Sequence, residues 1–150
     1  MCTGNTCRSP LAEALARRAT QQRGLDITFA SAGTGAALGS PATDGAILVG
    51  LERGVDLSRH RSRPLLPNSI SHDTLILVMS ETHVSGVRAV APKARVYLLD
   101  DYASFGASSR NVVDPYGGEL ADYRVAADAI EEMLEPVLAR VVSERTTGTR

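Results

Sequence analysis

Residues 2–10 form a short polar segment that leads directly into a helical pattern, and they read Cys2-Thr3-Gly4-Asn5-Thr6-Cys7-Arg8-Ser9-Pro10. Ser9 and Pro10 predict a helix start, with Ser9 as the N-cap and Pro10 as the first helical residue. Gly24 predicts that this helix ends near Arg23. A loop that enters a helix offers free backbone N–H groups and the positive end of the helix dipole. The segment therefore predicts an anion-binding loop.

Cys2 and Arg8 lie at the two ends of this loop, with five residues between them. A thiol among backbone N–H groups and a guanidinium can act as a thiolate nucleophile. The Arg8 guanidinium can hold two oxygens of a phosphate in a planar fork, which a lysine cannot do. The chain has 15 arginines and a single lysine, Lys93. A cysteine is therefore followed by an arginine six positions later about one time in ten by chance, and the spacing alone is weak evidence. The small loop residues and the Ser-Pro helix start therefore add most of the weight to a phosphate site.

Three further loop residues suit the binding of an anion. Gly4 lets the backbone approach the anion closely. Asn5 tolerates a left-handed conformation and can tie the loop to a neighbouring segment. The Ser9 hydroxyl can either cap the helix or hydrogen-bond the thiolate.

The rest of the chain alternates helical patterns with continuous apolar runs. We expect helices over 9–23, 43–53, 81–90 and from 120 to about 141, with a kink or an early break at Pro136. We expect strands over 27–30, 74–79 and 96–99, irregular structure over 59–68 and 100–118, and a frayed tail over about 145–150. This order predicts an α/β fold in which residues 1–150 form a single domain, a parallel sheet with flanking helices.

Composition excludes several classes of function. The 16 basic and 17 acidic residues give a net charge of −1, which argues against nucleic-acid binding through bulk charge. No apolar run approaches the length of a membrane span. Two cysteines cannot build a disulfide framework, so we expect a cytoplasmic protein. We also expect no metal, because neither a Cys-x-x-Cys nor a His-x3-His pair occurs.

Several motifs together resemble the low-molecular-weight protein tyrosine phosphatases, in particular the bacterial branch that includes protein arginine phosphatases. The loop 2–10 resembles the loop of that family. Ser31-Ala32-Gly33-Thr34, the His60-x-Ser-Arg stretch and Asp114-Pro115-Tyr116-Gly117-Gly118 follow in the family's order, so the resemblance extends from Cys2 to about Val141. It implies a cofactor-free phosphatase that acts on phosphorylated proteins through a phospho-cysteine intermediate.

The resemblance also implies roles for residues outside the loop. Asp114 would protonate the leaving group and then activate the hydrolytic water, and Tyr116 would line the mouth of the site. Asn5, Ser31 and His60 would form a polar network that holds the loop. The residues alone leave open a plain turn at Asp114 and a solvated His60 in a basic stretch. His72 and His83 have no partner that we can name and are expected on the surface.

Three loop positions bear on specificity and redox behaviour. Cys7 could pack behind the loop, or form a reversible disulfide with Cys2. Tyrosine-selective relatives usually carry a bulkier aliphatic side chain at the position of Thr6, whereas both Thr6 and Thr3 match the loop of the arginine phosphatases. We therefore favour phosphoarginine over phosphotyrosine as substrate.

We expect a monomer or a weak dimer without nucleic-acid or membrane partners.

The beginning of the chain departs from the family pattern. Family members carry a run of apolar residues before the cysteine, forming a central strand of the sheet, whereas here Met1 alone precedes Cys2. About five buried apolar side chains are worth roughly 8–15 kcal/mol, as much as the ~5–15 kcal/mol stability of a domain. We therefore expect that the first strand is lacking and that the true start lies upstream, at a GTG codon written as Met. The alternative function is an N-terminally truncated, inactive phosphate-binding relative.

Overall fold

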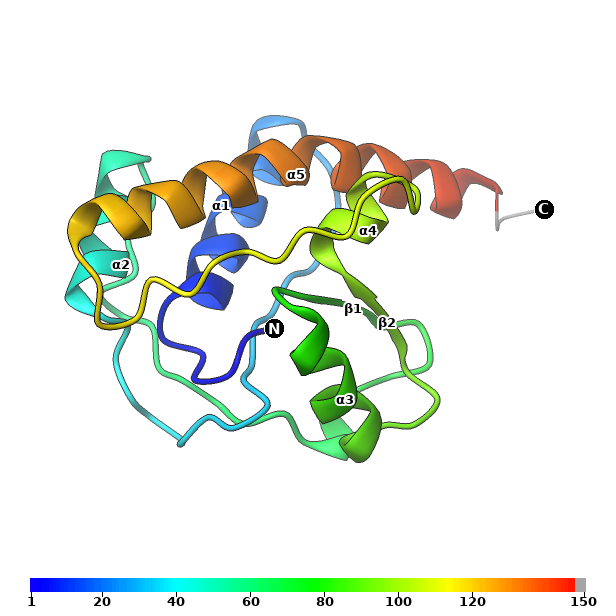
Figure 1. The fold of residues 1–150 in the computed structure, drawn as a ribbon. Helices are drawn as coiled ribbons and strands as arrows, with labels where there is room; N and C mark the ends of the chain where they lie inside the picture. Colours follow the sequence, from blue (N-terminus) through cyan, green and yellow to red (C-terminus); the bar gives the residue numbers. More distant parts are fainter. Residues whose placement is uncertain (148–150) are drawn as a thin grey trace.

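Two parallel strands lie at the centre of the computed structural model, which describes residues 1–147 (Figure 1). Strand β1 (Leu75–Val78) pairs with β2 (Arg95–Leu98) in a register that sets Leu75 opposite Arg95. Helix α3 (Glu81–Val90) connects them and has the predicted bounds. The continuous apolar runs thus form parallel strands joined through a helix, as expected for an α/β fold.

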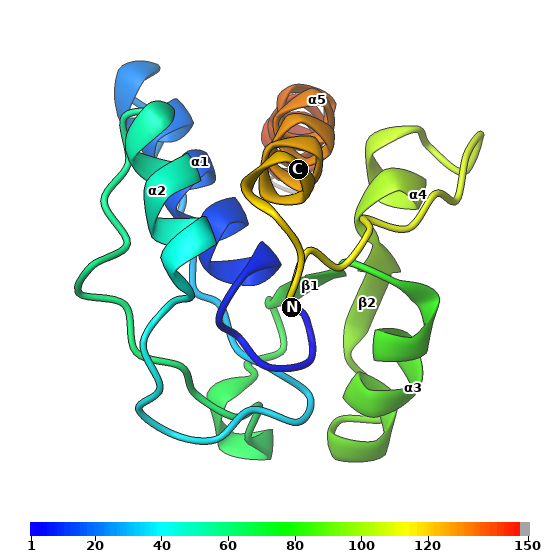
Figure 2. The ribbon, with the colours of Figure 1, turned by 60° about the vertical axis from the view of Figure 1, so that its left-hand side comes forward.

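The two faces of this sheet pack against different helices, which explains why its strands are apolar on both sides. One face packs against α3, and its buried side chains are Ile76, Val78, Val96 and Leu98. The other face contributes Leu75, Leu77 and Tyr97 to the larger core. That core contains α1 (Arg8–Gln22), α2 (Asp44–Glu52), α4 (Leu99–Ala103) and α5 (Leu120–Thr147). Figure 2 shows α1 and α2 on one side of the strands and α3 on the other.

The first helix begins at Arg8, two residues before the predicted first helical residue Pro10. Cys7 occupies the N-cap position without a capping side-chain hydrogen bond, so the prediction of Ser9 as the N-cap is wrong. Pro10 is the third helical residue, where a missing N–H has no intrahelical partner to lose. The Ser9 hydroxyl is free for the loop because it does not cap the helix.

Helix α5 runs unbroken through Pro136, so the predicted early break is wrong. A proline inside a helix costs about 3 kcal/mol. The buried side chains on either side of Pro136 supply packing that offsets this cost, and they are Met133, Leu134, Val137 and Leu138.

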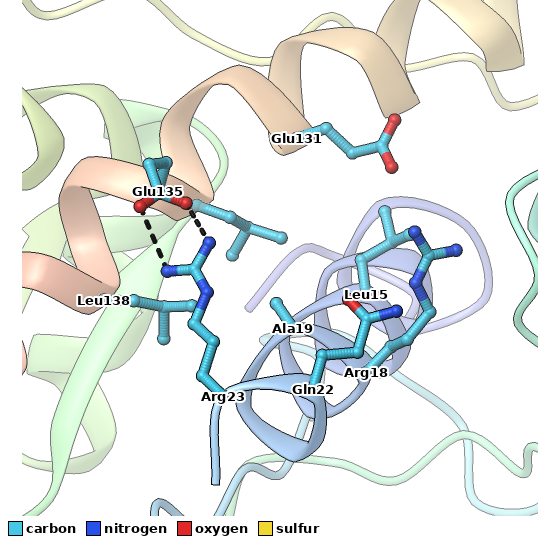
Figure 3. A pocket seen from close by; sticks show the side chains of 9 residues that line it. Leu15, Arg18, Ala19, Gln22, Arg23, Glu131, Glu135 and Leu138 are labelled. Atoms are coloured by element: carbon cyan, nitrogen blue, oxygen red, sulfur yellow. Dashed lines mark hydrogen bonds and ion pairs between the residues drawn. The ribbon is translucent and has the colours of Figure 1, made fainter. Parts of the chain in front are cut away.

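A cavity of about 190 Å³ lies between α1 and α5, where Arg23 forms an ion pair with Glu135 (Figure 3).

Three other expectations need correction. The segment 27–30 forms no strand, and the carbonyl of Phe29 accepts a hydrogen bond from the Arg17 side chain instead. The predicted irregular stretch 100–118 overlaps α4, whose buried Leu99 and Tyr102 pack into the core. The expected fraying over about 145–150 does not apply to residues up to 147, which continue α5, and residues 148–150 lie outside the described part.

Met1 and Cys2 lie beside the end of β1, in the manner of a very short strand. The amino group of Met1 donates to the carbonyl of Leu77 over 2.7 Å, and the N–H of Met79 donates to the carbonyl of Met1 over 3.1 Å. On the other side, Cys2 forms a parallel bridge with Gly33. Cys2 is therefore held between β1 and the segment around Gly33, which fixes the start of the loop.

Candidate active site

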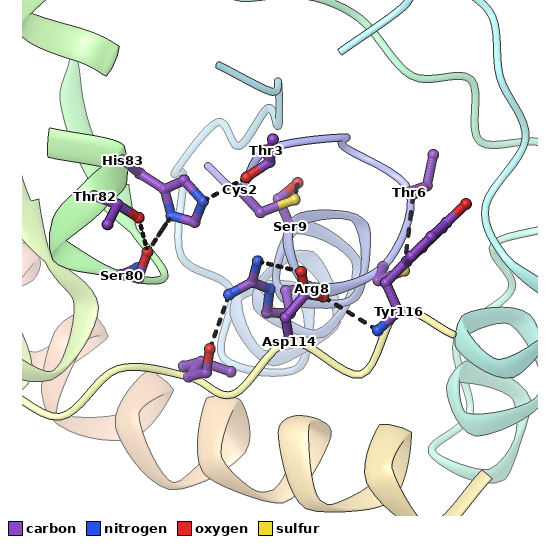
Figure 4. Close-up of polar contacts among 12 residues, drawn as sticks. Cys2, Thr3, Thr6, Arg8, Ser9, Ser80, Thr82, His83, Asp114 and Tyr116 are labelled. Atoms are coloured by element: carbon purple, nitrogen blue, oxygen red, sulfur yellow. Dashed lines mark hydrogen bonds and ion pairs between the residues drawn. The ribbon is translucent and has the colours of Figure 1, made fainter. Parts of the chain in front are cut away.

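The loop from Cys2 to Cys7 curls beneath the first turn of α1 and buries the Cys2 thiol (Figure 4). The Sγ atom of Cys2 lies 3.0 Å from the Oγ atom of Ser9. The side-chain amide of Asn5 donates to the same Ser9 oxygen over 2.8 Å, so the Ser9 hydroxyl proton is available to the sulfur. A hydroxyl in this position can donate a hydrogen bond to negative charge on the sulfur.

Asn5 connects the loop to two distant segments, one at Ser31 and one at residues 60–63. Its backbone is left-handed, with φ of 55°, and its side chain is fully buried. The Nδ2 atom donates to the Ser31 hydroxyl over 2.9 Å, and Oδ1 accepts from the N–H of Arg63 over 3.0 Å. The Nε2 atom of His60 lies 2.7 Å from the Asn5 carbonyl oxygen. The structure thus brings Asn5, Ser31 and His60 into one network around the loop.

The backbone next to Cys2 is pressed against the segment at Gly33. A side chain at Gly33 would place its Cβ atom 2.2 Å from the carbonyl oxygen of Thr3, closer than atoms can approach. The same oxygen accepts a hydrogen bond from the N–H of Gly35 over 3.0 Å. Glycine at position 33 therefore allows the close approach that holds the loop.

Arg8 is buried beside the loop and carries a donor without a partner. Its Nη1 atom donates to the carbonyl of Val112 over 2.9 Å, and Nη2 lies 3.1 Å from Oδ2 of Asp114. The buried Nε atom has no hydrogen-bond partner among residues 1–147. A buried unpaired donor is costly, and an oxyanion held by the guanidinium fork would satisfy it.

A pocket of about 810 Å³ opens over the loop, and its lining extends well beyond the thiol. The loop side is lined by Cys2, Thr3, Gly4, Thr6, Cys7 and Arg8. The other lining residues are 37 and 40–43, together with Asp44, Asp114 and Tyr116. The Tyr116 side chain is largely exposed, and its role at the mouth of the site stays a prediction. Asp44 was not singled out from the sequence, where it reads as an ordinary acidic residue at a helix start.

The segment that carries Asp114 is anchored at two points. The N–H of Val112 donates to the carbonyl of Met79 over 2.8 Å. Upstream, the buried Asp100 accepts from the Arg110 N–H over 2.7 Å, from the Arg110 guanidinium over 2.9 Å, and from the Ser108 hydroxyl. Burial raises the pKa of Asp100, but these hydrogen bonds outweigh burial and lower the pKa overall. Sequence reasoning missed Asp100, although an Asp directly after a buried strand is a usable signal.

His83 is buried, so the prediction of a surface residue is wrong for it, while His72 is exposed as expected. Its Nε2 atom lies 2.9 Å from Oγ1 of Thr3 in the loop. Burial, together with the positive charges of Arg8 and of the Met1 amino group, lowers the pKa of His83 to about 4 against the opposing effect of Asp114. The imidazole is therefore neutral at physiological pH.

Cys7 lies behind the loop as a buried free thiol. Its sulfur is 3.3 Å from the Thr43 hydroxyl oxygen and 3.9 Å from the Tyr123 hydroxyl oxygen. These contacts fit the packing role, and the disulfide with Cys2 stays a prediction.

Across residues 1–147, no helix is long and apolar enough to cross a membrane. In the same range, no three His, Cys, Asp or Glu residues gather closely enough to hold a metal ion.

Comparisons with known proteins agree with this geometry. The family model for low molecular weight phosphotyrosine protein phosphatase matches residues 1–147. A protein-arginine-phosphatase of Bacillus subtilis is 33% identical over 147 residues, which cover 97% of this chain and 96% of the relative. A probable low molecular weight protein-tyrosine-phosphatase, EpsP of Ralstonia nicotianae, is 31% identical over 143 residues, covering 94% of this chain and 92% of that protein.

A solved structure extends the likeness to the fold. It is a YwlE arginine phosphatase, a cysteine-to-serine mutant with a phosphorylated active site serine. The TM-score is 0.90 at 32% identity, over 97% of this chain and 95% of that one. Fold and relatives together define a cysteine-dependent protein phosphatase of the low-molecular-weight type. The chain belongs to the low molecular weight phosphotyrosine protein phosphatase family.

Proposed function

We propose that this phosphatase hydrolyses phosphoarginine on proteins, with Cys2 as nucleophile, Arg8 as phosphate clamp and Asp114 as general acid. The observation that carries the proposal is the shared pocket of these three residues, in which the buried Arg8 Nε lacks a partner among the described residues. Residues 1–150 would form its single domain. Tyr116 forms the rim, and the residues that bind phosphate or support the loop are Thr3, Gly4, Asn5, Thr6, Cys7, Ser9, Ser31 and His60.

In the first step, the Cys2 thiolate attacks phosphorus and a sulfur–phosphorus bond forms. The bond from phosphorus to the leaving nitrogen breaks, and Asp114 gives its proton to that nitrogen. Arg8 and the loop N–H groups stabilise the charge that develops on the phosphoryl oxygens. The Ser9 hydroxyl stabilises the thiolate before attack, from its position 3.0 Å away.

In the second step, water attacks the phosphorus of the phospho-cysteine. The Asp114 carboxylate accepts a proton from this water as the sulfur–phosphorus bond breaks. Inorganic phosphate leaves, and the Cys2 thiolate and a protonated Asp114 are regenerated. The same carboxyl therefore acts first as acid and then as base.

Charge in the pocket supports phosphoarginine as the substrate. Asp44 lines the pocket together with Asp114. The side chain of phosphoarginine joins its phosphate to a guanidinium, and the carboxylate of Asp44 attracts that positive charge. A phosphotyrosine ring carries no such charge. Thr6 also lines the pocket and matches the loop of arginine phosphatases.

Phosphotyrosine is the second candidate, because Tyr116 offers an exposed ring at the mouth. A phenyl ring could pack on that ring as well as a guanidinium could. Relatives that are about as similar to this chain bear tyrosine phosphatase names. The two substrates therefore have to be compared directly.

The test compares kcat/KM for free phosphoarginine and for p-nitrophenyl phosphate. Cys2→Ser should abolish turnover and keep phosphate binding. In an inactive phosphate-binding relative, wild type and Cys2→Ser would both bind phosphate and neither would turn over substrate. Asp44→Asn should lower kcat/KM for phosphoarginine about 2- to 5-fold more than kcat/KM for p-nitrophenyl phosphate, because this is the effect of losing one exposed ion pair. Asp73→Asn, an exposed carboxylate outside the pocket lining, is the matched control. If neither Asp44→Asn nor Thr6→Ile changed the ratio, phosphoarginine preference would be rejected.

We further propose that the enzyme works in the cytoplasm as a monomer or weak dimer, without nucleic-acid or membrane partners. Two buried free thiols support a reducing compartment. The balanced charge supports a protein substrate over a polyanion. Analytical ultracentrifugation tests the oligomeric state, and a stable tetramer would contradict it.

A further inference from the structure

We propose that His83 is a positioning residue that fixes the Thr3 hydroxyl as a hydrogen-bond donor to the bound phosphate. This inference rests on the proposed phosphate site and adds to it a residue from α3. His83 lies 80 positions from Thr3 in the sequence, and Figure 4 shows its ring between the start of α3 and the loop.

The contacts of the ring determine where its proton lies. The backbone N–H of Ser80 donates to Nδ1 of His83 over 3.1 Å. An N–H can only donate, so Nδ1 must carry a lone pair and the ring proton must be on Nε2. The Nε2–H group then donates to Oγ1 of Thr3 over 2.9 Å. The Thr3 oxygen is therefore an acceptor in this contact.

This direction leaves the hydroxyl proton of Thr3 unused. Oγ1 of Thr3 has no other hydrogen-bond partner within the described residues. Thr3 lines the pocket next to Cys2, so its proton can be donated to an oxyanion held there. If the ring proton were on Nδ1 instead, Nε2 would accept the Thr3 proton and remove it from the pocket.

The position of Thr3 is constrained at both its backbone and its side chain. Its carbonyl oxygen accepts from the N–H of Gly35 and lies against Gly33. The ring of His83 holds the side chain, and the ring is itself buried and attached to the first turn of α3. A donor held in place in advance costs little ordering when the anion binds. The neutral ring also leaves Arg8 as the cation of the pocket.

The experiment measures the Kd for inorganic phosphate by isothermal titration, together with the melting temperature of each variant. His83→Met removes the ring's contacts with Ser80 and with Thr3 at a similar volume, whereas His83→Gln can still accept from Ser80 and donate to Thr3. Thr3→Val removes the hydroxyl and keeps the shape. His72→Gln is the control, because that side chain is fully exposed.

We expect His83→Met and Thr3→Val each to weaken phosphate binding about 5-fold, the net effect of one hydrogen bond. The double variant should bind no more weakly than Thr3→Val alone, because both changes remove the same interaction. His83→Gln should restore binding to within about 2-fold of wild type. His83→Met also leaves the Ser80 N–H unpaired, which can lower stability. This loss occurs equally with and without Thr3→Val, so it cancels when the effect of His83→Met is compared between the two proteins.

Two results would overturn the inference alone: phosphate binding that His83→Met leaves unchanged, or a His83→Met effect that persists in full when Thr3 is Val. In either case wild-type phosphate binding and turnover would still support the proposed function. A wild-type protein that binds no phosphate would overturn the proposed function and this inference together.

Discussion

Nη2 of Arg8 lies 3.1 Å from Oδ2 of Asp114, so the cation that would clamp phosphate also holds the carboxyl proposed as the acid. A phosphate bound to Arg8 competes for that guanidinium. Bound phosphate would therefore disturb the contact that now holds the Asp114 carboxyl.

Asp114→Asn should lower kcat on phosphoarginine about 10²- to 10⁴-fold, because it removes the proton donor. Phosphate binding should remain, since Arg8 keeps its other contacts. The drop should be smaller on p-nitrophenyl phosphate, whose leaving group needs less protonation. Steady-state kinetics on both substrates measure this, and an equal drop on both would contradict the role as acid.

Gly33→Ala should disturb the loop far more than Gly35→Ala. The new Cβ at position 33 would lie 2.2 Å from the Thr3 carbonyl oxygen, whereas at position 35 it would lie 3.5 Å from the Thr3 methyl carbon. We expect a loss of about 1–3 kcal/mol in unfolding free energy for Gly33→Ala and less than about 0.5 kcal/mol for Gly35→Ala. Urea denaturation measures both, and equal losses would show that the close approach is not limiting.

The low pKa of His83 makes stability depend on pH. The pKa falls from 6.5 to about 4 on folding, so the unfolded chain binds this proton more readily. The contribution of His83 to the free energy of unfolding is complete above pH 6.5 and is lost as the pH falls towards 4. Between pH 7 and 5 the loss should be about 2 kcal/mol.

His83→Gln should reduce this pH dependence, because glutamine does not titrate, while His72→Gln should leave it unchanged. Carboxylates stay largely ionised between pH 7 and 5 and contribute little in that range. Urea unfolding of the three proteins at pH 5, 6 and 7 provides the comparison. The same slope in wild type and His83→Gln would mean that His83 does not cause it.

Asp100→Asn should destabilise the segment that carries Asp114. It removes a buried carboxylate that accepts from Ser108 and Arg110, at a cost of about 1–3 kcal/mol. We also expect kcat to fall several-fold, because Asp114 lies on the same segment. Glu132→Gln is the control, since Glu132 is an exposed partner of Arg110 and should change stability by less than about 1 kcal/mol. Equal effects of the two variants would contradict the anchoring role of Asp100.

Local patterns in the sequence were sufficient for the central elements of the fold. The apolar runs predicted β1 and β2, and helical spacing predicted α1, α2, α3 and α5 to within a few residues, apart from the carboxyl end of α5. The loop 2–10 predicted an anion site because its chemistry is local: a thiol, a guanidinium and free N–H groups within one helix start. The family resemblance added Ser31, His60 and Asp114, which no local pattern would join to the loop.

The sequence by itself determined the parallel α/β fold and the chemistry of the loop, since both depend on neighbours along the chain. Tertiary packing decided what depends on distant neighbours. It carried α5 through Pro136 because buried side chains offset the cost of the proline, and it left 27–30 outside the sheet. It also buried His83 against Thr3 and brought Asp44 to the pocket of Cys2. No sequence period encodes such contacts, because they form when segments far apart in the chain pack together.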